Sequence, residues 1–229
     1  MSENPRAPAA PAAPAAPAAP AAPAAHRRPP PPAVPTRDEI ALLPLFEGLP
    51  LNAITVVRTT DDAARAHDAL LTAGVCGFDT ESKPTFRKDE VNTGPHVLQF
   101  ATREQAWLFQ LLRADCLPVA AELLASTDLV KVGFGLDTDR TLIRNRLAVE
   151  PAAVIDLDHA FRRRGHRQSV GVKSAVALVF GQRFVKSRKA TTSNWAAARL
   201  TEAQLRYAAN DAYAALRVYE ALGIAAGSH

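Results

Sequence analysis

A proline stands at every third position from Pro8 to Pro23, with alanine pairs between the prolines. Proline fixes φ and donates no backbone hydrogen bond, so no stable helix can form across this repeat. Polyproline II has three residues per turn, so the prolines would line one edge of a semi-rigid spacer. With Pro29–Pro32 continuing the pattern, we predict a disordered Pro/Ala-rich tail over residues 1–37 and a folded domain over residues 38–229.

The composition of the chain bounds its class. Hydrophobic residues make up 48% of the 229 residues, which is enough for a sizeable core. No apolar run approaches the length of a membrane span, and the N-terminus does not have the pattern of a secretory signal. The two cysteines, Cys76 and Cys116, form no Cys-x-x-Cys pair. We therefore expect buried thiols in a cytoplasmic protein, without a disulfide framework or zinc cluster.

Apolar runs and turn residues predict an α/β domain. Early hairpin-like strands are followed by strand–helix alternation, which is typical of one mixed β-sheet covered by helices. The predicted strands are Ile54–Val57, Val75–Thr80, Val97–Ala101, Ala106–Phe109, Leu129–Val132 and Val154–Ile155. Predicted helices cover Asp61–Ala73 after a Thr60 cap, Pro118 to about Ser126, Thr138–Arg146, the region of His159–Arg163, Val170–Phe180 and Glu202–Leu222.

Two acids stand together where the second predicted strand ends. Asp79 and Glu81 are two residues apart, so in a strand they point to the same face. Adjacent carboxylates repel each other unless a cation lies between them. Such pairs are also common at solvent-facing strand ends, so this pair alone indicates a metal site only weakly.

A second acidic segment follows a buried strand and a glycine-rich turn. Asp137 is placed to cap the next helix, which is a structural role. Asp139 shares a helical face with Leu142 and Ile143, so we expect it to point toward the sheet. A carboxylate that points inward needs a partner, and a metal ion is one candidate.

The last predicted helix carries the third group. Thr201 and Gln204 have the spacing of a capping box, which marks the start of this helix. Tyr207 and Asp211 are four residues apart and therefore lie on one face of it. Ordinary core packing could explain the tyrosine. It does not explain an aspartate in an alanine-rich helix, because burying a lone charge is costly.

Taken in order, the segments Phe78–Glu81, Gly133–Leu142 and Tyr207–Asp211 resemble the three exonuclease motifs of the tyrosine-type DEDD 3′-5′ exonuclease family. The stretch Lys186–Asp211 is similar to part of the Werner syndrome helicase exonuclease domain and of ribonuclease D, both members of that family. The resemblance covers residues 50–222 and implies an RNase H-like fold, two divalent metal ions and 3′-5′ polarity.

The resemblance also implies a division of roles. Hard carboxylate oxygens suit Mg²⁺ or Mn²⁺, and the implied ligands of these two cations are Asp79, Glu81, Asp139 and Asp211. Tyr207 has an ordinary pKa of about 10, which makes it a poor base at neutral pH. We expect it to hold the attacking water by a hydrogen bond. The product would be a nucleoside 5′-monophosphate.

Residues for binding nucleic acid are expected in the stretch from His159 to Thr201, which contains no Asp or Glu. Basic side chains there can contact phosphates, and the best placed are Lys186, Arg188 and Lys189. Phe134 or Trp195 could stack on a terminal base, although each could equally pack in the core, as we expect for Trp195. DNA and RNA are not distinguished by these features.

Three alternatives remain open at the level of sequence. The same fold could be a non-catalytic nucleic-acid-binding module, although the presence of all four acids and the tyrosine argues against that. The enzyme could be narrower, a ribonuclease D-like enzyme that processes RNA 3′ ends. Finally, the proline-rich tail could bind a protein partner, with the chain acting as an adaptor. Deleting residues 1–37 would separate the adaptor from the enzyme, because nuclease activity should survive the deletion.

Overall fold

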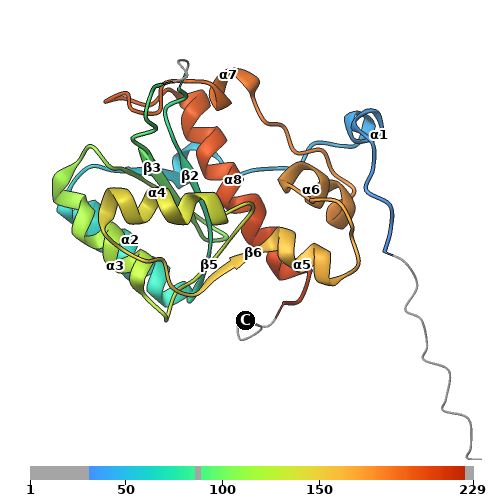
Figure 1. Cartoon of the computed structure of the whole chain (residues 1–229), viewed down its shortest axis with the longest axis horizontal. Helices are drawn as coiled ribbons and strands as arrows, with labels where there is room; N and C mark the ends of the chain where they lie inside the picture. The colour runs from blue at the N-terminus through green and yellow to red at the C-terminus, as the bar shows by residue number, and fades with distance from the viewer. Residues whose placement is uncertain (1–30, 86–88, 225–229) are drawn as a thin grey trace, which may run out of the picture. The chain divides into compact units, whose positions relative to one another are not determined.

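The computed structural model describes residues 31–85 and 89–224 (Figure 1). Most of the Pro/Ala-rich tail lies outside these residues, so its predicted disorder stays a prediction. The described chain forms a six-stranded sheet in the order β1-β4-β3-β2-β5-β6. Strands β2, β3 and β4 are antiparallel, whereas β1 pairs with β4, β5 with β2 and β6 with β5 in parallel. The predicted mixed α/β sheet is therefore confirmed.

The strands agree with the sequence pattern to within one residue at each end. They are β1 (Ile54–Val57), β2 (Val75–Glu81), β3 (Val97–Ala101), β4 (Ala106–Gln110), β5 (Val130–Gly133) and β6 (Val154–Asp156). The α-helices are α1 (Arg37–Leu42), α2 (Thr60–Ala73), α3 (Leu117–Ala125), α4 (Asp137–Leu147), α5 (Leu157–Arg163), α6 (Val172–Phe180), α7 (Arg188–Thr191) and α8 (Glu202–Ala221). The short helices α1 and α7 are additions that the sequence pattern did not predict.

Helix boundaries follow capping chemistry. Helix α2 begins after Thr59, whose side chain accepts from Asp62 N, so the predicted cap at Thr60 was one residue late. Thr201 and Gln204 form the predicted capping box of α8. Among the described residues, no helix is long and apolar enough to cross a membrane.

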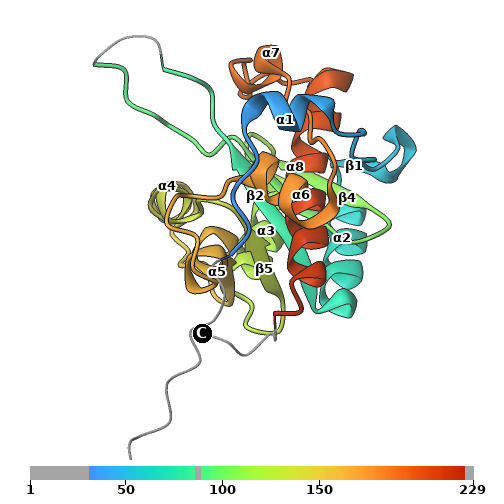
Figure 2. The ribbon, with the colours of Figure 1, turned by 90° about the vertical axis from the view of Figure 1, so that its right-hand side faces the viewer.

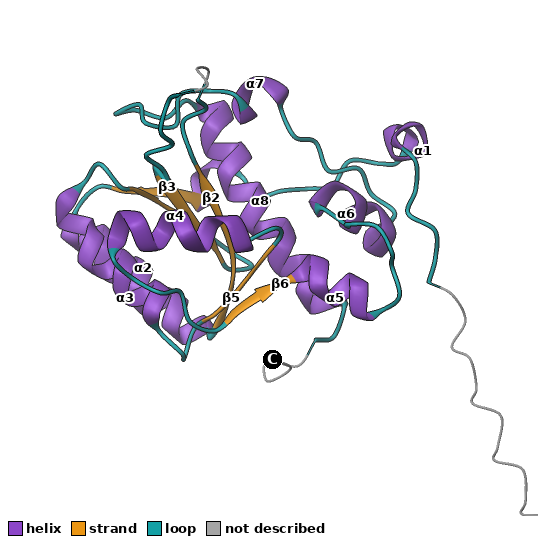
Figure 3. Ribbon diagram, viewed as in Figure 1, coloured by secondary structure: helices purple, strands orange, loops and turns teal. Residues whose placement is uncertain are grey.

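Helices cover both faces of the sheet (Figure 3). On one face, α2, α3 and α4 pack on a cluster that contains Phe78, Phe100 and Phe109. On the other face, α6 and α8 pack on Val132 of β5, and α8 also covers Ala101 of β3. Side chains alternate along each strand, so successive residues face first one of these two layers and then the other.

Helix α8 lies directly on β2 because the residues at their crossing are small. A Cβ atom added at Gly77 would lie only 1.7 Å from the carbonyl oxygen of Ala212. Ala208, Ala209 and Ala212 are fully buried at the same contact. The backbones therefore approach closely, and this approach brings Tyr207 and Asp211 of α8 next to the end of β2.

The segment before β1 is tied to the chain that leads into α7. Leu45 and Arg183 form a parallel β-bridge, and Asn210 of α8 accepts a hydrogen bond from Leu49 N at 2.9 Å. Helix α1 begins after Thr36, which forms a capping box with Glu39. Val34 packs against the hydrophobic cluster under α8. Packed structure thus begins before the predicted boundary at Asp38.

Replacing Gly77 with alanine should separate β2 from α8. We expect Gly77→Ala to lower the free energy of unfolding by about 1–3 kcal/mol or more, because the added methyl group meets backbone atoms that cannot rotate away. Gly171→Ala is the matched control, since a Cβ at Gly171 meets nothing within 4 Å and its φ of −77° suits alanine. Urea denaturation measures both variants. Equal losses would contradict close backbone packing at Gly77.

Candidate metal centre and active site

The end of β2 presents its acids toward α8. Strand β2 runs alongside α8 (Figure 2). Gly77 contacts α8, and alternation along the strand places Asp79 and Glu81 on the same face as Gly77. Phe78 packs in the core on the opposite face. The strand therefore aims two carboxylates into the layer between the sheet and α8, as the sequence spacing predicted.

Asp211 completes a cluster of three acids. Asp79, Glu81 and Asp211 each offer a carboxylate oxygen, and these atoms all lie within 4.8 Å of one another. Asp211 is only 4% exposed. Its oxygens are approached by the ammonium group of Lys186, 2.8 Å from Oδ2, and by the hydroxyl of Tyr207. Three carboxylates at this spacing, one of them almost fully buried, are an arrangement that a bound cation would satisfy.

Asp139 approaches from the other face of the sheet. Thr80 points away from Asp79 and Glu81, and its hydroxyl donates to Asp139 Oδ1 on α4 at 2.7 Å. Asp139 therefore lies beside the cluster of three acids but outside the group whose oxygens fall within 4.8 Å of one another. Thr80 was absent from the predicted site, although its place between the two acids could have indicated a residue that orients a third.

The capping role predicted for Asp137 is wrong. Helix α4 begins at Asp137 itself, and no side chain of its N-cap residue Leu136 can cap it. Instead, the carboxylate of Asp156 at the end of β6 accepts from Leu136 N at 2.9 Å. The side chain of Asp137 is 72% exposed and lies 3.6 Å from His159. A cap supplied from a neighbouring strand cannot be read from local sequence.

Burial raises the pKa of every acid in the site, and the charges of neighbouring site acids raise the pKa values of Asp79 and Glu81 further. Burial and then the charge of Asp79 raise the pKa of Glu81 to about 9. Burial and then the charge of Asp211 raise the pKa of Asp79 well above its ordinary value. Burial raises the pKa of Asp139, against the hydrogen bond from Thr80. Without a cation, Glu81 therefore holds a proton at neutral pH.

Lys186 supplies the positive charge that faces Asp211. Its ammonium nitrogen lies 2.8 Å from Asp211 Oδ2 and 5.3 Å from the centre of the Tyr207 ring. Burial raises the pKa of Asp211 to about 6, although the charge of Lys186 lowers it. Lys186 was predicted to contact phosphates, but here it is an ion-pair partner of the acidic cluster, so the phosphate contact stays a prediction.

Tyr207 lies one helical turn before Asp211 and faces the same site. Its hydroxyl accepts a hydrogen bond from Thr191 Oγ1 of α7 at 3.1 Å. Burial and the charge of Asp211 raise the pKa of Tyr207 above its ordinary value. The phenol therefore keeps its proton at neutral pH and can donate one hydrogen bond.

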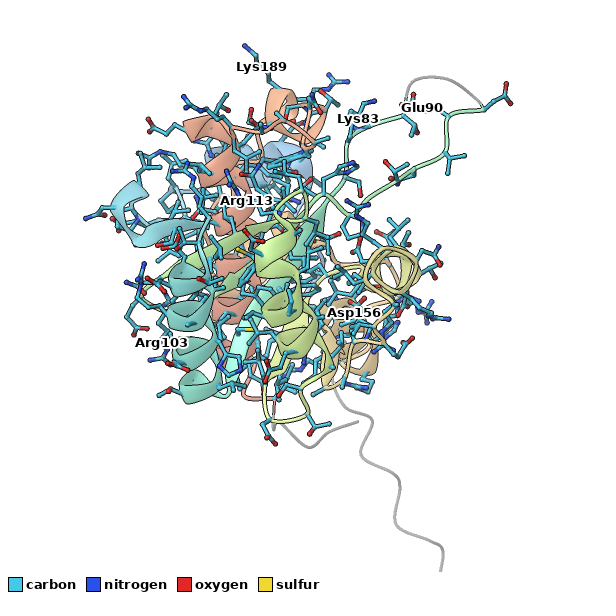
Figure 4. The ribbon with its side chains drawn as sticks, turned by 90° about the vertical axis from the view of Figure 1, so that its left-hand side faces the viewer. Lys83, Glu90, Arg103, Arg113, Asp156 and Lys189 are labelled. Atoms are coloured by element: carbon cyan, nitrogen blue, oxygen red, sulfur yellow. The ribbon has the colours of Figure 1, made fainter. Side chains whose placement is uncertain are left out.

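The predicted nucleic-acid contacts have different outcomes. Trp195 is fully buried and packs against Tyr207 with ring centres 5.8 Å apart, so it cannot stack on a base. Phe134 is half-buried beside the cluster under α8. Arg188 and Lys189 are exposed on α7, and Lys189 points away from the domain (Figure 4). Of the predicted contacts, Arg188 and Lys189 are the exposed cations that are free to contact a phosphate.

The residues of the site fit a divalent cation. The donor set consists of carboxylate oxygens, which Mg²⁺ and Mn²⁺ prefer. The raised pKa of Glu81 shows that the charge of Lys186 does not offset the effects of burial and of the neighbouring acids. A divalent cation would bind the deprotonated acids and lower their pKa values.

Comparison with known proteins decides the family. Residues 54–224 match the family described as 3′-5′ exonuclease. The chain belongs to this 3′-5′ exonuclease family. Members of the family are nucleases, so the chain falls in the hydrolase class of enzymes.

Two curated relatives illustrate this membership. The chain is 27% identical over 151 residues to the mouse bifunctional 3′-5′ exonuclease/ATP-dependent helicase WRN, a match that covers 65% of this chain and 11% of the relative. It is 30% identical over 170 residues to the Aedes aegypti exonuclease mut-7 homolog, which covers 63% of this chain and 23% of the relative. The chain thus spans less than a quarter of the length of either relative.

Solved structures confirm the fold of this exonuclease. The EXO domain of Aedes aegypti Nibbler superposes with a TM-score of 0.66 at 24% identity, covering 77% of this chain and 91% of that domain. Escherichia coli RNase D superposes with a TM-score of 0.65 at 22% identity, covering 74% of this chain and 44% of that protein. The predicted resemblance to exonucleases of this fold is therefore confirmed.

In chelator, stability should fall as pH rises. The pKa of Glu81 is raised from 4.5 to about 9, so its protonated form stabilises the fold fully below pH 4.5 and this stabilisation disappears as pH approaches 9. As the pH rises from 5.5 to 8.5 in chelator, we expect the melting temperature of wild type to fall relative to that of Glu81→Gln. Saturating Mg²⁺ should remove this trend. A difference independent of pH in chelator would contradict the raised pKa.

The ion pair of Lys186 and Asp211 should be measurable in chelator. A double-mutant cycle with Lys186→Met and Asp211→Asn should give a coupling free energy of about 1–3 kcal/mol, because each single change leaves a partly buried group without its partner. Lys189→Met, on exposed α7, is the control and should leave the free energy of unfolding unchanged. Additive effects of the two changes would show that the pair contributes nothing.

Proposed function

We propose that this chain is a divalent-cation-dependent 3′-5′ exonuclease that releases nucleoside 5′-monophosphates one at a time from nucleic-acid 3′ ends. The observation that carries the proposal is the convergence of Asp79, Glu81 and Asp211 within 4.8 Å. All three lie inside the segment that matches the exonuclease family, and they come from two separate elements, β2 and α8.

Four acids would hold the two cations, Mg²⁺ or Mn²⁺. Asp79, Glu81 and Asp211 supply oxygens from the face of α8, and Asp139 joins them from α4, oriented by Thr80. When bound, cations of this kind stabilise negative charge on the attacking and leaving oxygens of a phosphodiester. Because the acids are buried, they bind these cations in a site of low dielectric constant, where charge interactions are strong.

Tyr207 would orient the attacking water. Its phenol keeps its proton at neutral pH, because burial and the charge of Asp211 raise its pKa. It can therefore donate a hydrogen bond to a water oxygen but cannot remove a proton from it. Thr191 donates to the same hydroxyl and packing against Trp195 fixes the ring, so the donor direction is set before a substrate binds.

Cationic side chains near the acids would bind the substrate backbone. Arg188 and Lys189 are exposed on α7, whose Thr191 contacts Tyr207. Lys186 lies two residues before Arg188 and already faces the acids. Contacts to phosphates set the register of a strand without reading its sequence. DNA and RNA are both candidates, since the described contacts distinguish neither sugar.

The experiment uses 5′-labelled single-stranded DNA, partial-duplex DNA and RNA, each with Mg²⁺, Mn²⁺ or chelator. We expect a ladder that shortens from the 3′ end only when a divalent cation is present. Asp79→Asn should reduce the rate on the order of 10²-fold or more, because it removes a charge at the reacting phosphate. Asp137→Asn, an exposed acid close to Asp139 in sequence, is the matched control and should retain the wild-type rate.

The outcome separates the proposed enzyme from a binding module. Binding of the labelled strands without shortening under every metal condition would reject the exonuclease and favour a non-catalytic nucleic-acid-binding domain. Shortening of RNA alone would favour an RNA 3′-end processing enzyme. Internal cleavage, in place of a ladder from one end, would overturn the proposed polarity.

A further inference from the structure

Gln99 is a buried amide without hydrogen-bond partners. It lies at the centre of β3 and has no exposed surface. Neither its amide nitrogen nor its amide oxygen bonds to a described residue. A buried polar group left unpaired is destabilising, so a leucine or methionine here would give a more stable protein unless the amide has another task.

Strand register places this amide beside the acidic cluster. Gln99 is the direct cross-strand partner of Asp79 in the antiparallel pair of β2 and β3. Side chains opposite each other share a face and have Cβ atoms about 4.5–5.5 Å apart. The neighbours Val97 and Ala101 pack in the clusters covered by α8, so Gln99 also points into that layer. Its amide therefore lies beneath α8, next to Asp79.

A second glutamine in the same layer shows what an ordinary structural amide does. Gln110 of β4 pairs with Val97, is 2% exposed and donates to the carbonyl oxygen of Ala197 at 2.9 Å. Its amide anchors the loop that leads into α8. Gln99 has no such backbone partner, so anchoring a loop does not explain it.

Asp79 offers the amide of Gln99 a hydrogen-bond acceptor. Asp79 Oδ1 already accepts from Thr80 N at 2.9 Å, and a carboxylate can accept further hydrogen bonds. Trp195 Nε1, by contrast, is a buried donor without a partner in the cluster that contains Val97. Because a carboxylate only accepts, a hydrogen bond between Gln99 and Asp79 would use the NH₂ group of Gln99.

We propose that Gln99 is a positioning residue: its Nε2–H, which bonds to no described residue in this structure, donates to the carboxylate of its cross-strand partner Asp79 when a divalent cation binds, and holds that carboxylate in the orientation that binds the cation. A neutral donor suits this role, because it orders the carboxylate without adding a charge that competes with the cation. Residues that hydrogen-bond metal ligands from behind typically change metal affinity about 10–100-fold when removed. The inference rests on the proposed cation-dependent function of the same site.

The test compares Gln99→Met with Gln110→Met. Isothermal calorimetry with Mn²⁺ and no substrate measures cation affinity, and thermal unfolding in chelator measures stability. Gln99→Met should weaken Mn²⁺ binding about 10-fold or more, while its melting temperature in chelator equals or exceeds that of wild type. Gln110→Met should do the reverse, with a lower melting temperature and wild-type Mn²⁺ affinity, because it breaks the bond to Ala197. Gln99→Asn provides a second variant, whose shorter amide should also weaken Mn²⁺ binding.

Each outcome bears on one of the two proposals. Unchanged Mn²⁺ affinity in both Gln99 variants, with wild type binding normally, would overturn the positioning role and leave the exonuclease intact. Equal losses of affinity in Gln99→Met and Gln110→Met would also overturn it, since the effect would then come from general disturbance of the sheet. Failure of wild type itself to bind Mn²⁺ would instead reject the proposed function.

Discussion

Bringing several carboxylates together in a buried place is the constraint on which this domain depends. Burial raises the pKa of each acid, and the charges of neighbouring acids raise the pKa values of Asp79 and Glu81 further. The fold makes this arrangement possible through backbone contact, because Gly77 and the alanines of α8 let the helix lie directly on β2. Positive charge then has to be supplied to Asp211, and in the described chain Lys186 supplies it.

The sheet has a further role, since it separates the acids into two groups by the alternation of side chains. Asp79 and Glu81 face α8, and Thr80 between them reaches α4 and holds Asp139. One three-residue stretch of strand therefore orders acids on both faces. This explains why helices from both layers are needed to build a single site at the end of β2.

Features that depend on local chemistry were predictable from sequence, and features that depend on tertiary contacts were not. The spacing of Asp79 and Glu81, the capping box of α8 and most strand limits follow from periodicity and turn residues. The prediction that Asp137 caps α4 failed. The carboxylate that accepts from Leu136 N at the start of α4 belongs to Asp156 of the neighbouring strand β6. Lys186 was predicted to contact phosphates, and the structure adds an ion pair with Asp211 that local sequence does not indicate. Trp195 is fully buried in the core, as expected, and therefore cannot stack on a base.

The contacts that attach the segment before β1 to the chain leading into α7 and to α8 decide where the domain can be cut. The family match begins at residue 54, yet Leu45 bridges to Arg183, three residues before Lys186, and Leu49 bonds to Asn210 beside Asp211. A fragment cut at the edge of the recognised family segment would lose both attachments from the two elements that carry Lys186 and Asp211. The family match thus begins later in the chain than the packed structure does.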